Sequence, residues 1–285
     1  MPDRPTADQH QGREIIVDSG SRSIWGHYPL FDLVSLTTTS GSIAVSLTPQ
    51  PADPEKPNEP ARVFIKTESG SVSFGVNTGI SSIEDEERQE TYYVPTSSSA
   101  SSLPPRPYEV EVHTGSGSIN GRFLFSSSAK FSTDKGSINA FLIPVSYHEG
   151  EGQDPVISTS AKYGSQNIRL LEPVVFIDNA RHEVQQQPFN IPTAFHTSTH
   201  GSVNVHYPAH WAGKVNLRTS KYGHSCLNGK GLWVEKKGDG KAFAVKDPDN
   251  SSDTERRAYD WWGGRGNFAV YLETIESGSI NFLTA

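Results

Sequence analysis

One short phrase returns nine times along the chain. It consists of an alternating strand, a turn rich in Thr and Ser, a Gly-Ser pair, and a second alternating strand. The clearest copies run over residues 36–47, 64–76, 110–123, 129–142, 194–207 and 270–283, and weaker copies over 15–28, 157–170 and 215–227. A single copy is too short to bury its own apolar face, whereas stacked copies bury a continuous core. The repeat therefore predicts an all-β protein built from stacked units.

The spacing of the repeated glycine favours a β-solenoid. The shortest interval is 19 residues, from 22 to 41 and from 117 to 136, which fits two short strands and two turns. Arg22 occupies the glycine position of the first copy. We expect a β-solenoid or β-helix-like stack of about nine two-strand rungs, with long insertions at 77–107 and 230–266. The alternative is a series of hairpins that form a β-sandwich or propeller.

Alternation within a copy predicts which side chains face the core. In the copy over 194–207, the apolar residues after Gly-Ser are expected inside. Before Gly-Ser, Phe195 and Thr197 alternate with His196 and Ser198. We expect Phe195 on the dry side of this strand and His196 on the wet side. His206 is expected to face outward from the second strand of the same copy.

The position two residues after Gly-Ser is Asn in four copies: Asn120, Asn139, Asn204 and Asn281. In a solenoid these side chains would stack, and their amides would hydrogen-bond from rung to rung as in cross-β ladders. A polar ligand-binding stripe is the alternative, and the structural ladder is the preferred interpretation.

Composition limits the classes of partner and compartment. The net charge is −7 without a Lys/Arg-rich run, which argues against nucleic acid. Cys226 is the single cysteine, so no disulfide forms within the chain. The N-terminal residues lack the apolar region of a signal peptide, and no stretch approaches the about 20 apolar residues of a membrane span. We expect a cytoplasmic protein with a disordered tail (1–14) and one domain (15–285). Its oligomeric state stays open.

The two insertions carry aromatic side chains. Residues 77–107 are acidic and then rich in Ser and Pro, which is typical of a mobile loop, or of a lid that carries Tyr92 and Tyr93. Residues 230–266 end in AYDWWGGRG. Trp261 and Trp262 are expected to plug the open end of the solenoid before its last rung. The alternative is that they stack on a ligand.

Histidines gather at positions 196, 200, 206 and 210, with His224 further along. Neither an HExxH motif nor a Cys/His pattern accompanies them, so we expect no metal. GxSxG, a P-loop and GxGxxG after a strand are also missing from the sequence, and we expect no cofactor.

The Gly-Ser-Ile/Val-Asn phrase resembles that of a fungal repeat family of unknown function and, more loosely, bacterial adhesin-like β-solenoid domains. Residues 200–223 (HGSVNVHYPAHWAGKVNLRTSKYG) look like that family's rung followed by its aromatic link. Residues 259–282 resemble its closing turn and last rung. The matches cover most of the chain from Ile15 on, with Arg22 and His224-Ser-Cys as departures. The resemblance implies a solenoid fold and carries no catalytic residues.

Two functions compete at this point. The first is a solenoid that binds a small organic molecule, a carbohydrate or a partner on one face. The second is a cofactor-independent enzyme of fungal secondary metabolism, a cyclase or isomerase with an aromatic pocket closed by the insertions. A polysaccharide lyase is a third reading, which would need a groove lined by Lys and Arg. The candidate ligand-binding residues are Tyr92, Tyr93, Trp233, Trp261, Trp262, His224, His196 and His206.

Overall fold

The computed structural model describes residues 10–77, 80–85, 90–95, 103–147, 155–177, 180–182, 193–209, 211–246 and 269–284. All regular structure within these ranges is β-strand. The same ranges contain no helix of the length and apolarity that a membrane span requires.

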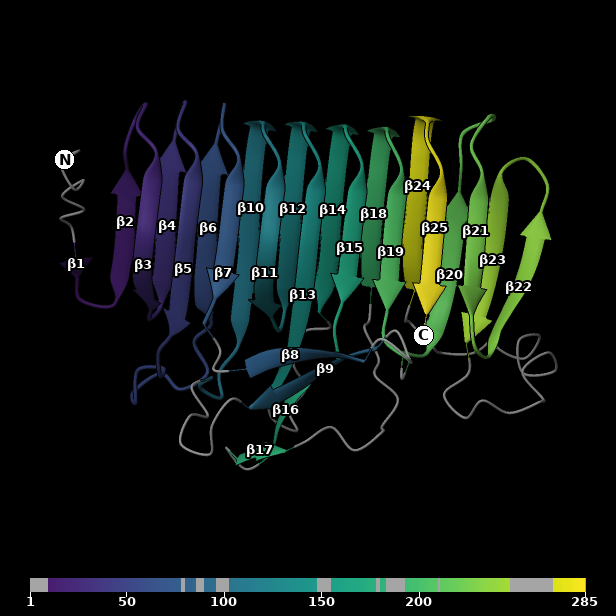
Figure 1. Cartoon of the computed structure of the whole chain (residues 1–285). Coiled ribbons are helices and arrows are strands. Elements are labelled where there is room, and N and C mark those ends of the chain that lie inside the picture. Colours follow the sequence, from purple (N-terminus) through teal and green to yellow (C-terminus); the bar gives the residue numbers. More distant parts are fainter. Residues whose placement is uncertain are drawn as a thin grey trace.

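Nine rungs form the described part of the molecule, and each gives one strand to each of two sheets (Figure 1). In chain order they are β2–β3 (Glu14–Asp18, Ile24–Leu30), β4–β5 (Leu33–Thr38, Ile43–Pro49), β6–β7 (Ala61–Thr67, Val72–Val76), β10–β11 (Tyr108–Ser116, Ile119–Phe125), β12–β13 (Ser128–Lys135, Ile138–Tyr147), β14–β15 (Val156–Tyr163, Gln166–Leu170), β18–β19 (Thr193–His200, Val203–Tyr207), β20–β21 (Gly213–Arg218, Ser225–Gly229) and β24–β25 (Ala269–Ser277, Ile280–Thr284). Each rung coincides with one of the nine copies of the repeat.

The pairing confirms the solenoid and rules out the hairpin alternative. The first strands of successive rungs pair in parallel in one sheet, here called sheet A, and the second strands do so in sheet B. The two strands of a rung therefore belong to different sheets, whereas the strands of a hairpin would pair with each other. Buried apolar side chains from both sheets form the continuous core between them.

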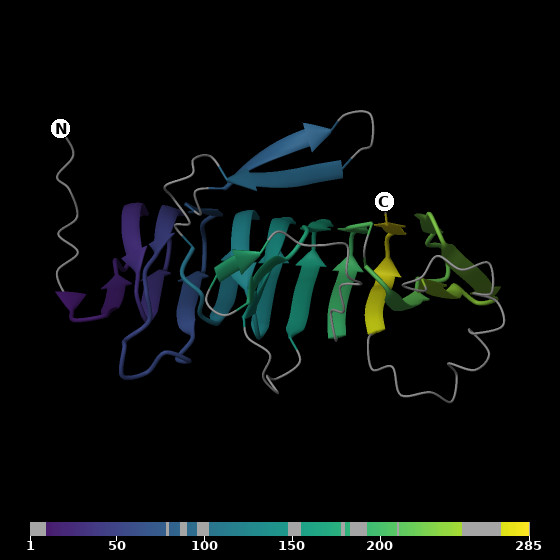
Figure 2. The ribbon, with the colours of Figure 1, turned by 90° about the horizontal axis from the view of Figure 1, so that it is seen from below.

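The order of the rungs in space differs from their order in the chain. In sheet A, β24 lies between β18 and β20, and in sheet B, β25 lies between β19 and β21. The C-terminal rung, drawn in yellow in Figures 1 and 2, is therefore inside the stack. Beyond β20, sheet A continues antiparallel through β23 (Lys241–Lys246) and β22 (Leu232–Lys237). The Trp plug was expected at an open end beside the last rung of the chain, and that rung does not lie at an end of the stack.

A column of glycines lies at the corner between the two sheets. A Cβ on Gly70 would overlap the carbonyl oxygen of Gly41, and a Cβ on Gly117 would overlap that of Gly70. Each clash is with the backbone of the preceding rung in the stack. The first rung has no preceding rung, so it tolerates the side chain of Arg22 at this position. Gly223 meets the oxygen of Gly278, as the order of the rungs requires.

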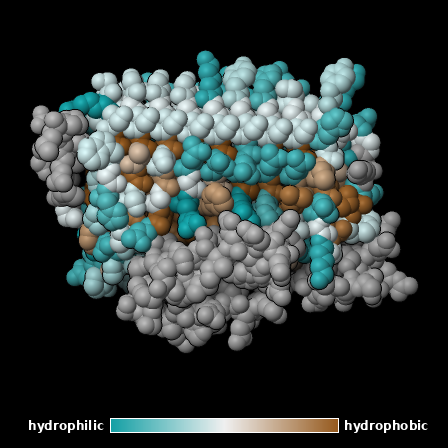
Figure 3. All heavy atoms as spheres, viewed as in Figure 1, coloured by the Kyte–Doolittle hydropathy of each residue, from teal (hydrophilic) through white to brown (hydrophobic). Residues whose placement is uncertain are grey.

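Polar side chains tie the rungs together beside this column. The buried Thr67 and Thr114 hydroxyls donate to the carbonyl oxygens of Gly41 and Gly70 at 2.9 and 2.8 Å. Along the outer corner, the backbone N–H of most Gly-Ser serines donates to the Ser hydroxyl one rung back, as Ser118 does to Ser71 at 3.2 Å. Repeated positions thus become hydrogen-bonded ladders along the stack. Figure 3 shows rows of similar hydropathy that run along the stack.

The Asn residues align as the sequence predicted. Asn120, Asn139, Asn204 and Asn281 occupy one row of sheet B, which also includes Asn167. The Asn167 amide donates to Asn139 Oδ1 at 3.0 Å, and that of Asn281 to Asn204 Oδ1 at 2.7 Å. Asn167 also stands two residues after a Gly-Ser pair, so the same pattern would have found it.

The first insertion is partly ordered against the stack. β8 (Ile80–Asp85) and β9 (Glu90–Pro95) pair antiparallel. At the C-terminal end of the insertion, Leu103 and Arg106 are buried. Arg106 donates to the carbonyls of Phe31 and Glu59 and forms a 3.0 Å ion pair with Asp32. The mobile-loop reading is therefore wrong for this end of the insertion.

The predicted phase of β18 is also wrong, because His196 faces the core and Phe195 faces solvent. His196 is fully buried, and its Nδ1 shares a 2.8 Å hydrogen bond with Thr159 Oγ1, while the Tyr207 hydroxyl lies 3.4 Å from Nε2. Register with β14 places Ala194 beside Ile157, and this fixes the inward set. The alternation allowed either phase, and the neighbouring rung decides between them.

Substituting Gly136 should destabilise the stack. Gly136 has a φ of +157°, and a Cβ there would overlap the carbonyl oxygen of Gly117. We expect Gly136→Ala to lower the free energy of unfolding by about 1–3 kcal/mol, measured by urea denaturation. The control is Gly238→Ala in the β22–β23 turn, where a Cβ meets nothing within 4 Å. Equal stability of the two variants would contradict the role given to the glycine column.

Burial of His196 should make stability fall in acid. Desolvation lowers its pKa from 6.5 to about 3 in the folded chain, so below pH 6.5 the unfolded chain binds the proton more readily. The stability that the chain gains from a neutral His196 is complete above about pH 7. As the pH falls toward 3, the free energy of unfolding decreases by up to about 1.4 kcal/mol per pH unit. His196→Leu should unfold with a shallower dependence on pH than the wild type between pH 7 and pH 5. Parallel pH profiles of the two proteins would contradict this prediction.

Candidate functional site

The predicted site residues whose side chains the structure describes do not come together. His196 is inside the core, whereas His206 lies on the outer face of sheet B next to Arg169. Burial and Arg169 both lower the pKa of His206. The two imidazoles therefore face different sides, and the expectation that both point outward fails for His196.

The remaining candidates are dispersed or lie beyond the described ranges. His224 is exposed next to β21 at the edge of sheet B, and Trp233 is half-buried on β22 at the edge of sheet A. Tyr92 and Tyr93 belong to β9, of which only the backbone path is described. Trp261 and Trp262 lie outside the described residues. A single aromatic pocket built from these residues stays a prediction.

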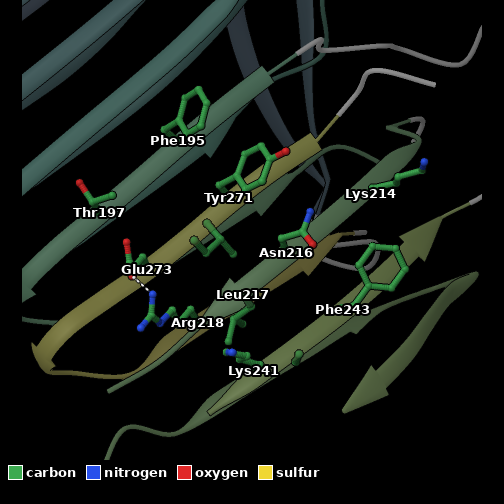
Figure 4. Close-up of a pocket in the computed structure, with 12 residues that line it drawn as sticks. Phe195, Thr197, Lys214, Asn216, Leu217, Arg218, Lys241, Phe243, Tyr271 and Glu273 are labelled. Atoms are coloured by element: carbon green, nitrogen blue, oxygen red, sulfur yellow. Dashed lines mark ion pairs between the residues drawn. The ribbon is translucent and has the colours of Figure 1, made fainter. Parts of the chain in front are cut away.

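A different set of residues forms a groove on the outer face of sheet A. The groove has a volume of about 690 Å³ and crosses β18, β24, β20 and β23. Figure 4 shows Phe195, Tyr271, Asn216 and Phe243 on these four strands, one from each strand. Their order across the sheet follows from strand register, which arranges them in rows.

The central row carries three rings and one amide. Register places Phe195 beside Tyr271, Tyr271 beside Asn216, and Asn216 beside Phe243. The Phe195 and Tyr271 rings stack with their centroids 5.1 Å apart, and each side chain is 42% exposed. In Figure 4, Asn216 stands between the rings of Tyr271 and Phe243. The short amide therefore leaves a slot with an aromatic side chain on either side.

The width of this slot follows from the sheet. Tyr271 and Phe243 are two strands apart, which corresponds to about 9.5 Å. Optimal carbon–carbon contacts of about 3.5–4 Å on each side account for about 7–8 Å of that distance. A flat ring would fill the slot incompletely, whereas a puckered ring with out-of-plane atoms would contact both walls.

Charged and hydroxyl side chains form the next row. Thr197, Glu273, Arg218 and Lys241 follow one another on β18, β24, β20 and β23. Arg218 Nη1 lies 3.4 Å from Glu273 Oε1, and the Arg218 side chain is 68% exposed. Lys214 lines the other end of the groove, four residues before Arg218 on β20. The ring slot thus lies between polar groups at both ends, as Figure 4 shows.

Among the predicted residues whose side chains the structure describes, Trp233 is the one on the same face as this groove. It pairs with Val245 on β23, which in turn pairs with Lys214 on β20, so the three share a row on the outer face. Sequence reasoning missed the groove residues themselves, but a signal existed. Phe195 and Tyr271 each follow the first apolar residue of their copies, Ala194 and Val270, and an alignment on that residue would have revealed their shared outward position.

The arrangement is suited to binding rather than to acid–base chemistry. Among the described residues that line the groove, Glu273 is the single carboxylate, and it is ion-paired with Arg218. Glycoside hydrolysis commonly requires two carboxyl groups across the bond. Rings, an amide, a hydroxyl and cations instead provide apolar contact with directional hydrogen bonds.

Within the described part of the chain, no three His, Cys, Asp or Glu side chains converge as metal ligands would.

Comparison with known proteins found no matching family model, no matching curated protein and no matching solved structure. The resemblance to a fungal repeat family therefore stays a prediction.

Proposed function

We propose that this protein is a carbohydrate-binding β-solenoid whose saccharide lies across β18, β24, β20 and β23. The observation that carries the proposal is the slot between Tyr271 and Phe243 with Asn216 at its centre. Sugar rings present C–H faces that pack on aromatic side chains, and their hydroxyls exchange hydrogen bonds with amides and hydroxyls.

The dimensions of the slot favour a sugar over a flat ligand. Its width of about 9.5 Å exceeds the about 7 Å that a planar ring needs between two aromatic rings. Thr197 and the Tyr271 hydroxyl supply further hydrogen-bonding groups at the groove. An extended, open surface of this kind accepts a chain that continues past the groove on both sides.

The exposure of the rings supports the same function. Two stacked aromatic side chains that are each 42% exposed leave apolar surface in contact with water. Contiguous exposed apolar patches mark binding sites more often than isolated exposed residues do. The enzyme alternative lacks a comparable observation among the described residues, where Trp233 and His224 belong to the edges of different sheets.

Removing one wall of the slot should weaken binding. We expect the wild type to bind at least one glycan on an array of neutral, uronate-containing and sulfated oligosaccharides. Tyr271→Ala and Phe243→Ala should each weaken that interaction by about 10- to 30-fold, because each removes stacking area. Isothermal titration with the bound glycan measures the change.

The matched control is Trp25→Ala, which removes a 53% exposed ring from β3, at the opposite end of the stack. It should bind like the wild type. The proposal fails if the array shows no binding, or if folded Tyr271→Ala and Phe243→Ala variants bind as tightly as Trp25→Ala.

A further inference from the structure

We infer that the outer face of sheet B holds a second binding site, for an organic carboxylate with an apolar body. The site is centred on Arg169 of β15 and His206 of β19, which are register neighbours. It goes beyond the proposed carbohydrate binding, because it lies on the other sheet and uses none of the side chains of the groove.

Arg169 is a half-buried cation without a counter-ion. Within the described part of the chain, no carboxylate pairs with its guanidinium and no side-chain hydrogen bond holds it. Burial and the charge of Arg169 together lower the pKa of the His206 imidazole. The charge of the guanidinium therefore still acts on its neighbour. Because taking a charge out of water without a partner is costly, such a group marks a site that an anion completes.

The Asn row offers hydrogen-bond donors next to this pair. Asn167 and Asn204 are register neighbours, and they stand two residues before Arg169 and His206 on the same face. Each of the two amides is hydrogen-bonded to the Asn on its other side. Between Asn167 and Asn204 themselves, both of which the structure describes, there is no such bond. Asn204 accepts through Oδ1, so its N–H groups are left as donors beside the unpaired cation.

Apolar side chains flank the pair in the same row. Register places Phe141 beside Arg169 and Leu283 beside His206. The Phe141 side chain is 37% exposed and that of Leu283 is 42% exposed. Neighbouring strands lie about 4.8 Å apart, so these two residues are about 14 Å apart across the row. A ligand whose charged group contacts Arg169 therefore finds apolar surface one strand away on either side of the pair.

The charge of the site favours a carboxylate. A guanidinium binds the two oxygens of a planar carboxylate through two parallel hydrogen bonds. Since the pKa of His206 is lowered from 6.5, its imidazole is neutral at pH 7. The pair then carries one positive charge, which a single carboxylate balances, while the neutral imidazole still donates one N–H. A phosphate dianion would keep an unbalanced negative charge.

NMR of protein with isotope-labelled histidine tests the inference, with the His206 ring signal assigned by its loss in His206→Asn. The probes at pH 7 are octanoate, acetate, octanol and inorganic phosphate. We expect octanoate to shift the signal saturably. It should bind about tenfold or more tightly than acetate or octanol, because it alone combines the charge with an apolar body.

Bound octanoate should also raise the pKa of His206. The groups that face this imidazole across the sheet are Arg169 on β15 and the uncharged Leu283 on β25. An anion held by Arg169 offsets the charge that lowers the pKa, and it favours the protonated imidazole. The pH titration of the ring signal with and without octanoate measures this change. A pKa that octanoate leaves unchanged would contradict binding at this pair.

Substitutions locate the binding. Arg169→Gln should weaken octanoate binding by about tenfold or more, because it removes the charge and keeps a side chain of similar polarity. At least one of Phe141→Ala and Leu283→Ala should weaken octanoate by about 3- to 10-fold and leave acetate unaffected. Arg62→Gln is the matched control, since it removes the same charge from the outer face of sheet A. Circular dichroism confirms that each variant is folded.

Several outcomes would overturn the inference. One is an unshifted His206 signal at octanoate concentrations up to about 20 mM, and another is equal binding by Arg169→Gln and Arg62→Gln. Tighter binding of phosphate than of octanoate would refute the choice of a carboxylate. Tyr271→Ala, which alters only the groove on sheet A, should leave octanoate binding unchanged. Loss of binding in that variant would assign octanoate to the groove, whereas failure of the glycan experiments leaves this site unaffected.

Discussion

The close approach of successive rungs at one corner governs the architecture. The carbonyl oxygen of each corner glycine occupies the space that a Cβ of the next rung would need. Hydroxyls of buried residues such as Thr67 and Thr114 donate to these same oxygens, so the corner is both tight and hydrogen-bonded. Only the first rung escapes this steric condition, which explains why Arg22 is tolerated there.

Because the corner is alike in every rung, it does not dictate which rung follows which. The chain uses this freedom when it places β24–β25 between β18–β19 and β20–β21. That order brings Tyr271 against Phe195 and places Asn216 between Tyr271 and Phe243. If the rungs had stacked in chain order, Asn216 would have neighboured Phe195, and the stacked pair of Phe195 and Tyr271 beside the slot would not have formed.

The same order determines the electrostatics of the groove. Glu273 and Arg218 come from segments more than fifty residues apart in the chain, and they pair because β24 and β20 are neighbours. The antiparallel turn back into β23 then adds Lys241 beside Arg218. A repeat that is uniform in its core thus presents a surface whose chemistry changes along the stack, and the proposed binding site lies where rung order departs from chain order.

The repeat by itself determined the nine rungs, their strands, the glycine corner and the Asn row, because each depends on a local pattern that recurs at a fixed place. Tertiary structure decided the rest. The alternation around Ala194 and His196 allows either of the two residues' faces to point to the core. The pairing with the neighbouring strand decides that both Ala194 and His196 point inward. From the sequence alone, Arg106 belongs to a polar loop. Only the structure shows that backbone carbonyls from distant parts of the chain surround its side chain. The groove depends on which rungs are neighbours, and the repeat does not determine this because the glycine corners of the later rungs are alike.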